Sequence, residues 1–289
     1  MASCRACRES VTEAMATSAG KVADKLKELT KSSLVRDDSG SRRVYRGDDG
    51  HIYHSVTSII SATDPPEKQE AIAAWLARPG SEQTRQMAAE RGTKAHSNAE
   101  FIAKVGRKLA FNAARKRNVW KTCDDGLERC PPDITQWALK KAAATAPRVS
   151  WSSAGWARGL RHFLLDRITA IHGAELKVYD KTCSAAGTFD LLADVDGALA
   201  LVDWKTSSRY RDEKMFESYK VQAAAYRRLL RSVTGIEVPG AWIVVATRSG
   251  PPQELFMDQY DLNLYEVEFE LRCSQFQELV KVENEKDAA

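Results

Sequence analysis

The chain has 289 residues, of which 43% are hydrophobic and 28% are charged, values that are typical of an ordinary soluble protein. This length is enough for one large domain or two modest ones. The formal net charge of +4 is mild, so it permits a polyanionic partner without requiring one, and the local distribution of charge matters more.

The sequence argues against a membrane protein and against a secreted one. No apolar run approaches the length of a membrane span, and the N-terminus lacks the apolar stretch of a secretory signal. We therefore expect a cytoplasmic protein, in the host cytoplasm if a phage encodes it. Six scattered cysteines are too few for a disulfide scaffold in a chain of this size. Cys4 and Cys7 have the spacing of zinc ligands but no matching second pair, which favours reduced thiols without a metal.

The N-terminal part of the chain predicts one helix, one hairpin and the start of a helical region. Apolar residues at helical spacing predict an amphipathic helix over residues 1–35, either packed on the core or extended as an arm. A short hairpin follows over residues 42–54, with its turn at Asp48-Asp49-Gly50. Residues 55–61 combine β-branched side chains with Ser and Thr caps, and the prolines that follow start a helix through Leu76.

Residues 81–105 predict a helical region that is interrupted at Gly92. Thr93 can cap the second helix, in which His96 and Glu100 lie one turn apart on the same face. The most basic stretch of the chain is 104–121, where no acidic residue accompanies the cations. A charge run of this kind is usually a solvated face, but its aromatic residues make a phosphate-contacting surface an equal alternative.

The second half predicts strands and helices in alternation. Helices are expected over residues 134–144 and 152–171, and the pattern changes to a strand over 175–179. After a hairpin, residues 212–233 form a strongly amphipathic helix with Gln222 and Tyr226 on one side. Residues 241–247 are an apolar strand of the kind found in the middle of a sheet, and a last helix runs over about 262–282.

The hairpin itself brings two acids together. A two-residue turn at Asp196-Gly197 fixes the register, so that Asp190 falls directly opposite Asp203. Side chains alternate along a strand, which places Lys205 on the same face as Asp203. Two like charges that face each other destabilise a sheet unless a cation lies between them, and a divalent metal ion is the natural candidate.

These motifs, in this order, resemble the PD-(D/E)xK nuclease superfamily, and most closely its RecB-like and Cas4-like branch. Gly187-Thr-Phe-Asp190 resembles the G-x-x-D motif of the branch and Asp203-Trp-Lys205 resembles its D-x-K motif. Gln222-Ala-Ala-Ala-Tyr226 is similar to its Q-x-x-x-Y motif. Arg91-Gly-Thr-Lys-Ala-His96 resembles the segment that supplies its metal-binding histidine. The resemblance extends over about residues 52–247.

The resemblance implies an α/β fold with a restriction-endonuclease-like core, in which helices flank a central mixed β-sheet, preceded by an N-terminal helical region. We expect an arm and the start of a hairpin over 1–50, a mainly helical region over 51–170 and the nuclease core over 171–289, together in one compact domain. The pattern is closest to phage and mitochondrial-type exonucleases. Branch members with an iron–sulfur cluster bind it through three cysteines near the C-terminus. Only Cys273 lies beyond the core here, so no cluster is expected.

The resemblance also implies the roles of the site residues. His96, Asp190 and Asp203 would bind one or two Mg²⁺ or Mn²⁺ ions, and Lys205 would orient or deprotonate the attacking water. Glu175, Gln222 and Tyr226 would support the site. The candidate DNA contacts are Arg107, Lys108, Arg115, Lys116, Arg117, Thr206 and Ser207.

The favoured function is therefore a metal-dependent DNA exonuclease that acts on single- or double-stranded ends, as in phage replication, recombination or DNA degradation. A structure-specific or restriction-type endonuclease and a nuclease-fold protein that binds DNA without cutting remain as alternatives. Simpler explanations exist for single motifs: a lone D-x-K is most often an exposed ion pair, and Gln222 and Tyr226 could line a helix–sheet interface. The oligomeric state has no signature in the sequence.

Overall fold

The computed structural model describes residues 24–29, 34–40 and 42–287. Most of the helix predicted over 1–35 lies outside these ranges; residues 24–29 are helical, and Val35 already belongs to a strand. Among the described helices, none has an apolar stretch of the length that crosses a bilayer.

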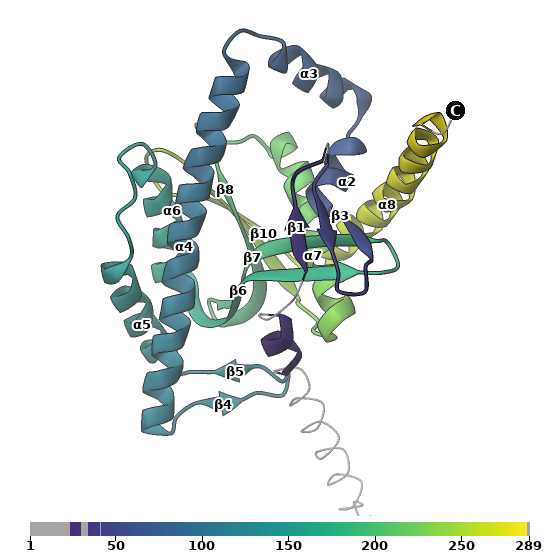
Figure 1. Cartoon of the computed structure of the whole chain (residues 1–289). Helices are drawn as coiled ribbons and strands as arrows, with labels where there is room; N and C mark the ends of the chain where they lie inside the picture. The colour runs from purple at the N-terminus through teal and green to yellow at the C-terminus, as the bar shows by residue number, and fades with distance from the viewer. Residues whose placement is uncertain (1–23, 30–33, 41, 288–289) are drawn as a thin grey trace, which may run out of the picture.

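A mixed β-sheet forms the centre of the fold (Figure 1). Its strands lie in the order β1 (Val35–Asp37), β2 (Val44–Arg46), β3 (Ile52–Ser55), β7 (Ala185–Val195), β8 (Ala198–Thr206), β9 (Gly240–Ala246) and β10 (Gln253–Met257), with β6 (Ile168–Asp180) paired to β7. The β3–β7 and β8–β9 pairs are parallel, and the other pairs are antiparallel. This mixed sheet with helices against it confirms the predicted fold class.

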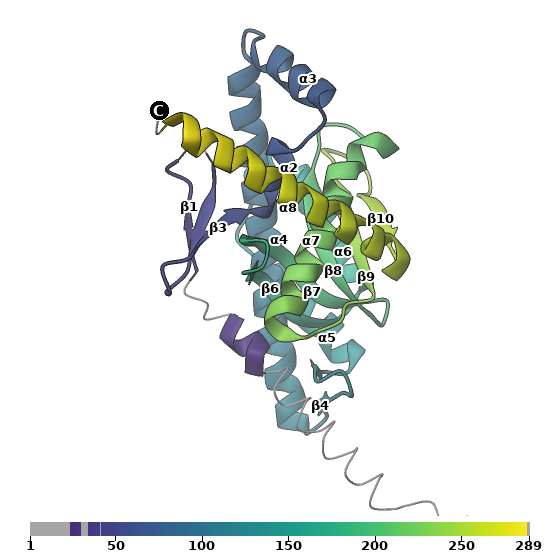
Figure 2. The same ribbon diagram turned by 90° about the vertical axis from the view of Figure 1, so that its right-hand side faces the viewer.

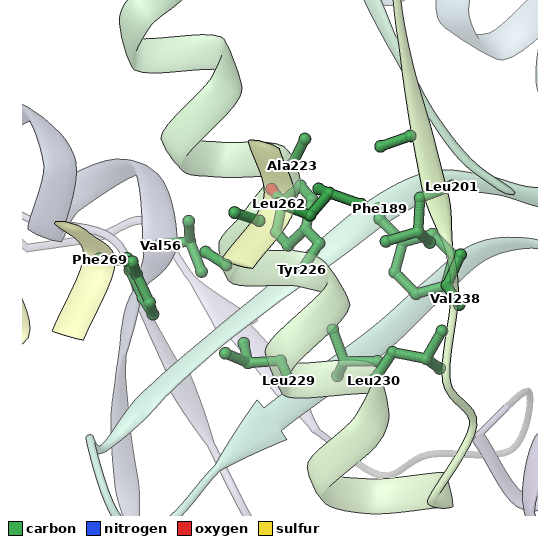
Figure 3. Close-up of a cluster of buried hydrophobic side chains, with 14 of the residues drawn as sticks. Val56, Phe189, Leu201, Ala223, Tyr226, Leu229, Leu230, Val238, Leu262 and Phe269 are labelled. Carbon is green, nitrogen blue, oxygen red and sulfur yellow. The ribbon is translucent and has the colours of Figure 1, made fainter. Parts of the chain in front are cut away.

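Helices cover both faces of the sheet (Figures 1 and 2). One face packs against α4 (Ser81–Arg117), α5 (Pro132–Thr145) and α6 (Ala154–Arg167), and the other against α2 (Val56–Ala62), α7 (Glu217–Thr234) and α8 (Gln259–Asp287). Along β8, Leu199 and Leu201 join the core under α7, shown in Figure 3, whereas Val202 and Trp204 join the core under α6. This alternation is the period of two that a strand imposes, and it anchors β8 on both faces.

Short elements complete the chain. Helix α3 (Pro66–Leu76) links α2 to α4 and has no buried residue, and a small separate hairpin consists of β4 (Lys121–Thr122) and β5 (Glu128–Arg129). A 3₁₀ turn, η1 (Glu213–Phe216), precedes α7. Ser55 accepts a hydrogen bond from the N–H of Ser58 and so caps α2, which resolves the mixed signal of residues 55–61 in favour of a helix.

Several predicted elements are confirmed. Helix α3 starts at its proline, the N-terminal hairpin turns at residues 48–50, and α5, α7 and β9 lie close to their expected bounds. Asp196 and Gly197 have φ angles of 51° and 89°, as the two-residue turn requires. The register pairs Val195 with Ala198 and Leu191 with Val202, as predicted.

The predicted interruption at Gly92 is wrong. Helix α4 runs through this position without a break, so Thr93 does not cap a new helix. A Cβ at position 92 would lie 3.2 Å from Thr206 Oγ1. The glycine therefore serves the close approach of α4 to the end of β8.

The boundaries around β6 also differ from the prediction. The helix expected over 152–171 ends at Arg167, and β6 begins at Ile168 and has 13 residues instead of the five expected over 175–179. Ile168, Ile171 and Ala174 are buried in this strand. Because such an apolar run fits a buried helix as well as a buried strand, periodicity alone did not separate them. Strands β1, β4, β5 and β10 were not predicted, and α8 is longer than expected.

Candidate active site

The predicted catalytic residues lie together in one cleft of about 480 Å³. Elements far apart in the sequence supply them: α4, β6, β7, β8 and α7. The cleft is lined by His96, Glu175, Asp190, Asp203, Lys205, Gln222 and Tyr226, among others.

The cleft opens where two paired strands separate. On one edge, β7 pairs with β3 at residues 185–186 and with β8 at residues 191–195, so residues 187–190 lie between these two partners. The β7–β8 register leads directly to Asp190 opposite Asp203, but the ladder stops at Leu191 and Val202. Beyond this end of the ladder, the backbone N–H of Trp204 donates to the side-chain oxygen Oδ2 of Asp190 at 2.7 Å. The carboxylate thus replaces a strand–strand bond and is held in a fixed position.

Each aspartate has a basic partner. His96 Nδ1 lies 3.1 Å from Asp190 Oδ1, and the Lys205 ammonium forms an ion pair with Asp203. Asp203 is only 4% exposed, and its Oδ2 has no hydrogen-bond partner among the described residues beyond this ion contact. A buried carboxylate oxygen in that condition is a ready acceptor for a cation.

The two aspartates differ in their ionisation. Burial raises the pKa of Asp203, and the nearby Asp190 charge adds to the effect, although Lys205 opposes it. Burial also acts against the ionised form of Asp190, but His96, Lys205 and the Trp204 N–H outweigh it and hold the pKa of Asp190 below its ordinary value. For Lys205, burial is outweighed by both aspartates, so its pKa is raised and the ammonium stays charged.

Glu175 adds a third carboxyl beside this pair. It lies between the pairs Ala174–Leu191 and Leu176–Phe189 and is therefore across from Asp190. Its φ of 55° places a non-glycine residue in the left-handed region, a strained conformation that often marks functional sites. Burial, and then the charge of Asp190, raises the pKa of Glu175 to about 8. A carboxyl kept protonated in this way loses its proton when a cation arrives nearby.

Gln222 and Tyr226 face the cleft from α7. Gln222 Nε2 donates to the Tyr226 hydroxyl at 2.9 Å, as two residues one helical turn apart can do. The Tyr226 ring packs in the core near Phe189, with 6.3 Å between the ring centroids (Figure 3). Tyr226 can therefore fill both of its predicted roles. Its ring packs at the helix–sheet interface, and its hydroxyl belongs to the cleft.

Comparison with known families gives a match to the PD-(D/E)XK nuclease superfamily over residues 69–283. The chain belongs to this superfamily. The human mitochondrial genome maintenance exonuclease 1 is 28% identical over 135 residues, which cover 45% of this chain and 39% of that protein. A solved structure from Eubacterium rectale, assigned provisionally as an exonuclease, is similar with 12% identity and a TM-score of 0.28, over 63% of this chain and 84% of the other.

Nucleases of the PD-(D/E)XK superfamily generally use divalent metal ions, and the donor set of this cleft suits one. Carboxylates and an imidazole are suitable ligands for such ions, and the buried Asp203 Oδ2, which contacts the Lys205 ammonium, is an acceptor that a metal ion could take over. Among the described residues, no three His, Cys, Asp or Glu side chains are already gathered around a common centre. The reason is local, since His96 bonds to Asp190 and Lys205 to Asp203. A metal ion would displace these two contacts.

The predicted DNA contacts lie outside the cleft. Arg107 is turned toward the sheet: its Nε donates to the Ile171 carbonyl at 3.2 Å, and its guanidinium lies 5.1 Å from the Phe111 ring centroid. Ser207 is buried, and its hydroxyl donates to the Arg209 carbonyl. Thr206 lies against Gly92 of α4. Exposed cations of the segment, namely Lys108, Arg115, Lys116 and Arg117, are near the C-terminal end of α4. For all seven residues, contact with DNA stays a prediction.

The cleft also contains residues that were not selected from the sequence. Glu100 lines it one turn after His96, a spacing that was visible but was not used. Arg36, Arg43 and Tyr45 line it from the N-terminal strands. No local pattern connects them to the site, because the parallel pairing of His54 with Ala185 brings these strands to β7.

Proposed function

We propose that this nuclease-superfamily protein is a divalent-metal-dependent exonuclease that hydrolyses phosphodiester bonds in DNA. The observation that carries the proposal is the convergence of Asp190, Asp203 and Lys205 with His96 at the point where β7 and β8 separate. The chain spans less than half of the length of the human exonuclease that it matches, and the name of that relative supports the exonuclease class and the DNA substrate.

In this proposal, Asp190 and Asp203 would hold one or two Mg²⁺ or Mn²⁺ ions, with His96 as a nitrogen ligand that favours Mn²⁺ over Ca²⁺. A bound ion supplies charge for the phosphate oxygens and lowers the pKa of a water molecule. Glu175, whose pKa is raised in the cleft, would be ionised beside a bound cation and could then accept a hydrogen bond from the attacking water. Gln222 and Tyr226 donate hydrogen bonds that position the strand or the ligand shell.

Lys205 lies in the cleft beside both aspartates and forms an ion pair with Asp203. Held charged by the two aspartates, it orients the attacking water and offsets the charge that develops on the phosphate. Preorganised electrostatic groups of this kind lower a barrier by about 3–4 kcal/mol. A role in replication, recombination or DNA breakdown of the phage type would suit such an activity.

An end-dependent assay tests the proposal. End-labelled linear DNA and covalently closed circular DNA of the same sequence are incubated with the protein in Mg²⁺, Mn²⁺ or EDTA. We expect degradation of the linear form alone, in either metal and not in EDTA. Cutting of closed circles would identify an endonuclease instead. Binding of DNA without any divalent-dependent cleavage would identify a DNA-binding protein with a nuclease fold.

A further inference from the structure

A second hollow of about 740 Å³ lies on the other flank of α4 from the catalytic cleft. Arg91 lines this second hollow and Gly92 lines the catalytic cleft, and adjacent residues of a helix point about 100° apart. The hollow is bounded by α4, by the start of α6 and by the loop after β9. Its polar and aromatic lining includes Arg91, Trp151, Ser153, Trp156, Arg158 and Arg248.

The side-chain hydroxyl of Ser153 is an unsatisfied hydrogen-bonding group in the lining of this hollow. The residue is fully buried, and its Oγ has no partner among the described residues. It occupies the N-cap position of α6, yet its side chain does not cap the helix. The first N–H groups of a helix form a partly positive end that suits an anion. A free buried hydroxyl beside such an end is a donor without an acceptor, which is costly unless a ligand supplies the acceptor.

Three arginines line the same hollow. Arg91, Arg158 and Arg248 have no carboxylate partner within the described parts of the chain, while Glu90 at the rim pairs with Lys94. A Cβ on Gly155 would lie 1.9 Å from the Arg248 carbonyl oxygen, so the glycine allows the Arg248 loop to lie directly over the start of α6. The Arg91 guanidinium lies 4.8 Å from the centroid of the Trp156 ring, which holds it at the wall of the hollow.

Trp151 adds a surface for a flat ring. Its side chain is 92% exposed, although a large aromatic residue normally gains by burial. Exposed aromatic rings next to arginines are the usual means of binding single-stranded nucleic acids, with bases stacked on the ring and phosphates held by the cations.

We infer that this hollow binds a phosphate group of a nucleic-acid strand, with the neighbouring base stacked on Trp151. The inference rests on the proposed nuclease function for the class of ligand. Trp156 connects the two sites, since its Nε1 donates to the carbonyl of Ser207 at 2.7 Å, two residues after Lys205. The strand would thus be anchored on one flank of α4 while it is cut on the other.

Binding of a 3′-fluorescein-labelled oligothymidine to the full chain in EDTA tests this inference without cleavage. Fluorescence anisotropy is measured over a range of salt concentrations. We expect Ser153→Ala and Trp151→Ala each to weaken binding about tenfold. The double variant Arg158→Ala/Arg248→Ala should lower the slope of log K against log salt by about 0.7, the value for one phosphate that is no longer neutralised. Because the Ser153 hydroxyl has no partner among the described residues, Ser153→Ala should keep the melting temperature of the free wild-type protein or raise it.

Matched controls and a second oligonucleotide complete the test. Trp137→Ala removes another exposed tryptophan, 47% exposed on α5, and should leave binding unchanged. An effect seen only with a 5′-phosphorylated oligonucleotide would assign the hollow to a terminal phosphate, and an equal effect with a 5′-hydroxyl would assign it to an internal one. Wild-type affinity and salt dependence in all three variants would overturn the inference, even if the protein cuts DNA. A wild type that binds no strand at all would overturn this inference together with the proposed function.

Discussion

Gly187 and Tyr226 fit together so closely that a Cβ at position 187 would lie 2.5 Å from Cε1 of the tyrosine ring. The glycine of the G-x-x-D motif therefore has a steric role: it allows the α7 tyrosine to lie over β7 and to keep its hydroxyl bonded to Gln222. The contact also joins the core under α7 to the wall of the cleft.

The substitution Gly187→Ala should move the Tyr226 ring. We expect a loss of about 1–3 kcal/mol in the free energy of unfolding, because overpacking a buried site forces its neighbours to shift. The rate of DNA cleavage should fall as well, since a displaced Tyr226 ring moves the hydrogen-bonded Gln222 and Tyr226 side chains away from the cleft. Urea unfolding and DNA degradation are the measurements. Gly40→Ala, whose Cβ would meet no atom closer than 3.7 Å, is the control. Wild-type stability and turnover in Gly187→Ala would contradict the assigned role.

Asp194 predicts a pH dependence of stability away from the cleft. Burial alone would raise the pKa of Asp194, but bonds from His172 and Arg129 outweigh it and hold this pKa below its ordinary value. A carboxyl with a lowered folded-state pKa stabilises the fold above its unfolded pKa of about 3.9, and this contribution is lost as the pH falls through the folded value.

The substitution Asp194→Asn should therefore destabilise the protein by about 3–5 kcal/mol at pH 7. The neutral amide no longer balances the charge of the Arg129 guanidinium, which pairs with the buried Asp194 carboxylate. The difference from the wild type should shrink as the pH falls below about 4. Urea unfolding between pH 3 and pH 7 measures it. Asp196→Asn, an exposed neighbour on the same hairpin, should change stability by less than about 1 kcal/mol. A gap that stays constant down to the lowest pH would exclude this explanation.

His96 should contribute to metal affinity. In the proposed site its imidazole leaves Asp190 and binds the cation, so His96→Ala should weaken Mn²⁺ binding by at least about tenfold in calorimetric titrations. His162→Ala removes a histidine that pairs with Asp166 on the surface, and should leave the titration unchanged. Equal Mn²⁺ affinity in His96→Ala and the wild type would remove His96 from the ligand set.

The basic segment predicts a dependence on substrate length. Arg115 lies 19 residues after His96 in one continuous helix, which corresponds to about 28 Å along α4. A duplex held at the cleft needs about 8 base pairs to span that distance. Combined replacement of Lys108, Arg115, Lys116 and Arg117 by alanine should weaken the binding of longer duplexes and reduce its salt dependence, while shorter ones are unaffected. Lys281→Ala serves as a charge control. Equal binding of long duplexes by the variant would mark the segment as a solvated face.

The features predicted from the sequence are those that short-range geometry determines. A two-residue turn fixes which residues face each other, so the Asp190–Asp203 register followed directly from Asp196-Gly197. Gly92 was misread because its reason is a neighbour, Thr206, that lies more than a hundred positions later. The cleft arginines Arg36 and Arg43 were missed for the same cause, since the β3–β7 pairing that brings them there joins distant segments.

The rate of DNA degradation by the wild type and by Asp203→Asn is the most direct test of the account. Both proteins are incubated with end-labelled linear DNA in Mn²⁺, Mg²⁺ and EDTA, and their binding to the same DNA is measured in EDTA. The account predicts cleavage by the wild type in either metal, none in EDTA, and a rate at least about 100-fold lower for Asp203→Asn and for Lys205→Ala with DNA binding retained. Near-wild-type cleavage by Asp203→Asn, or cleavage by the wild type in EDTA, would contradict it.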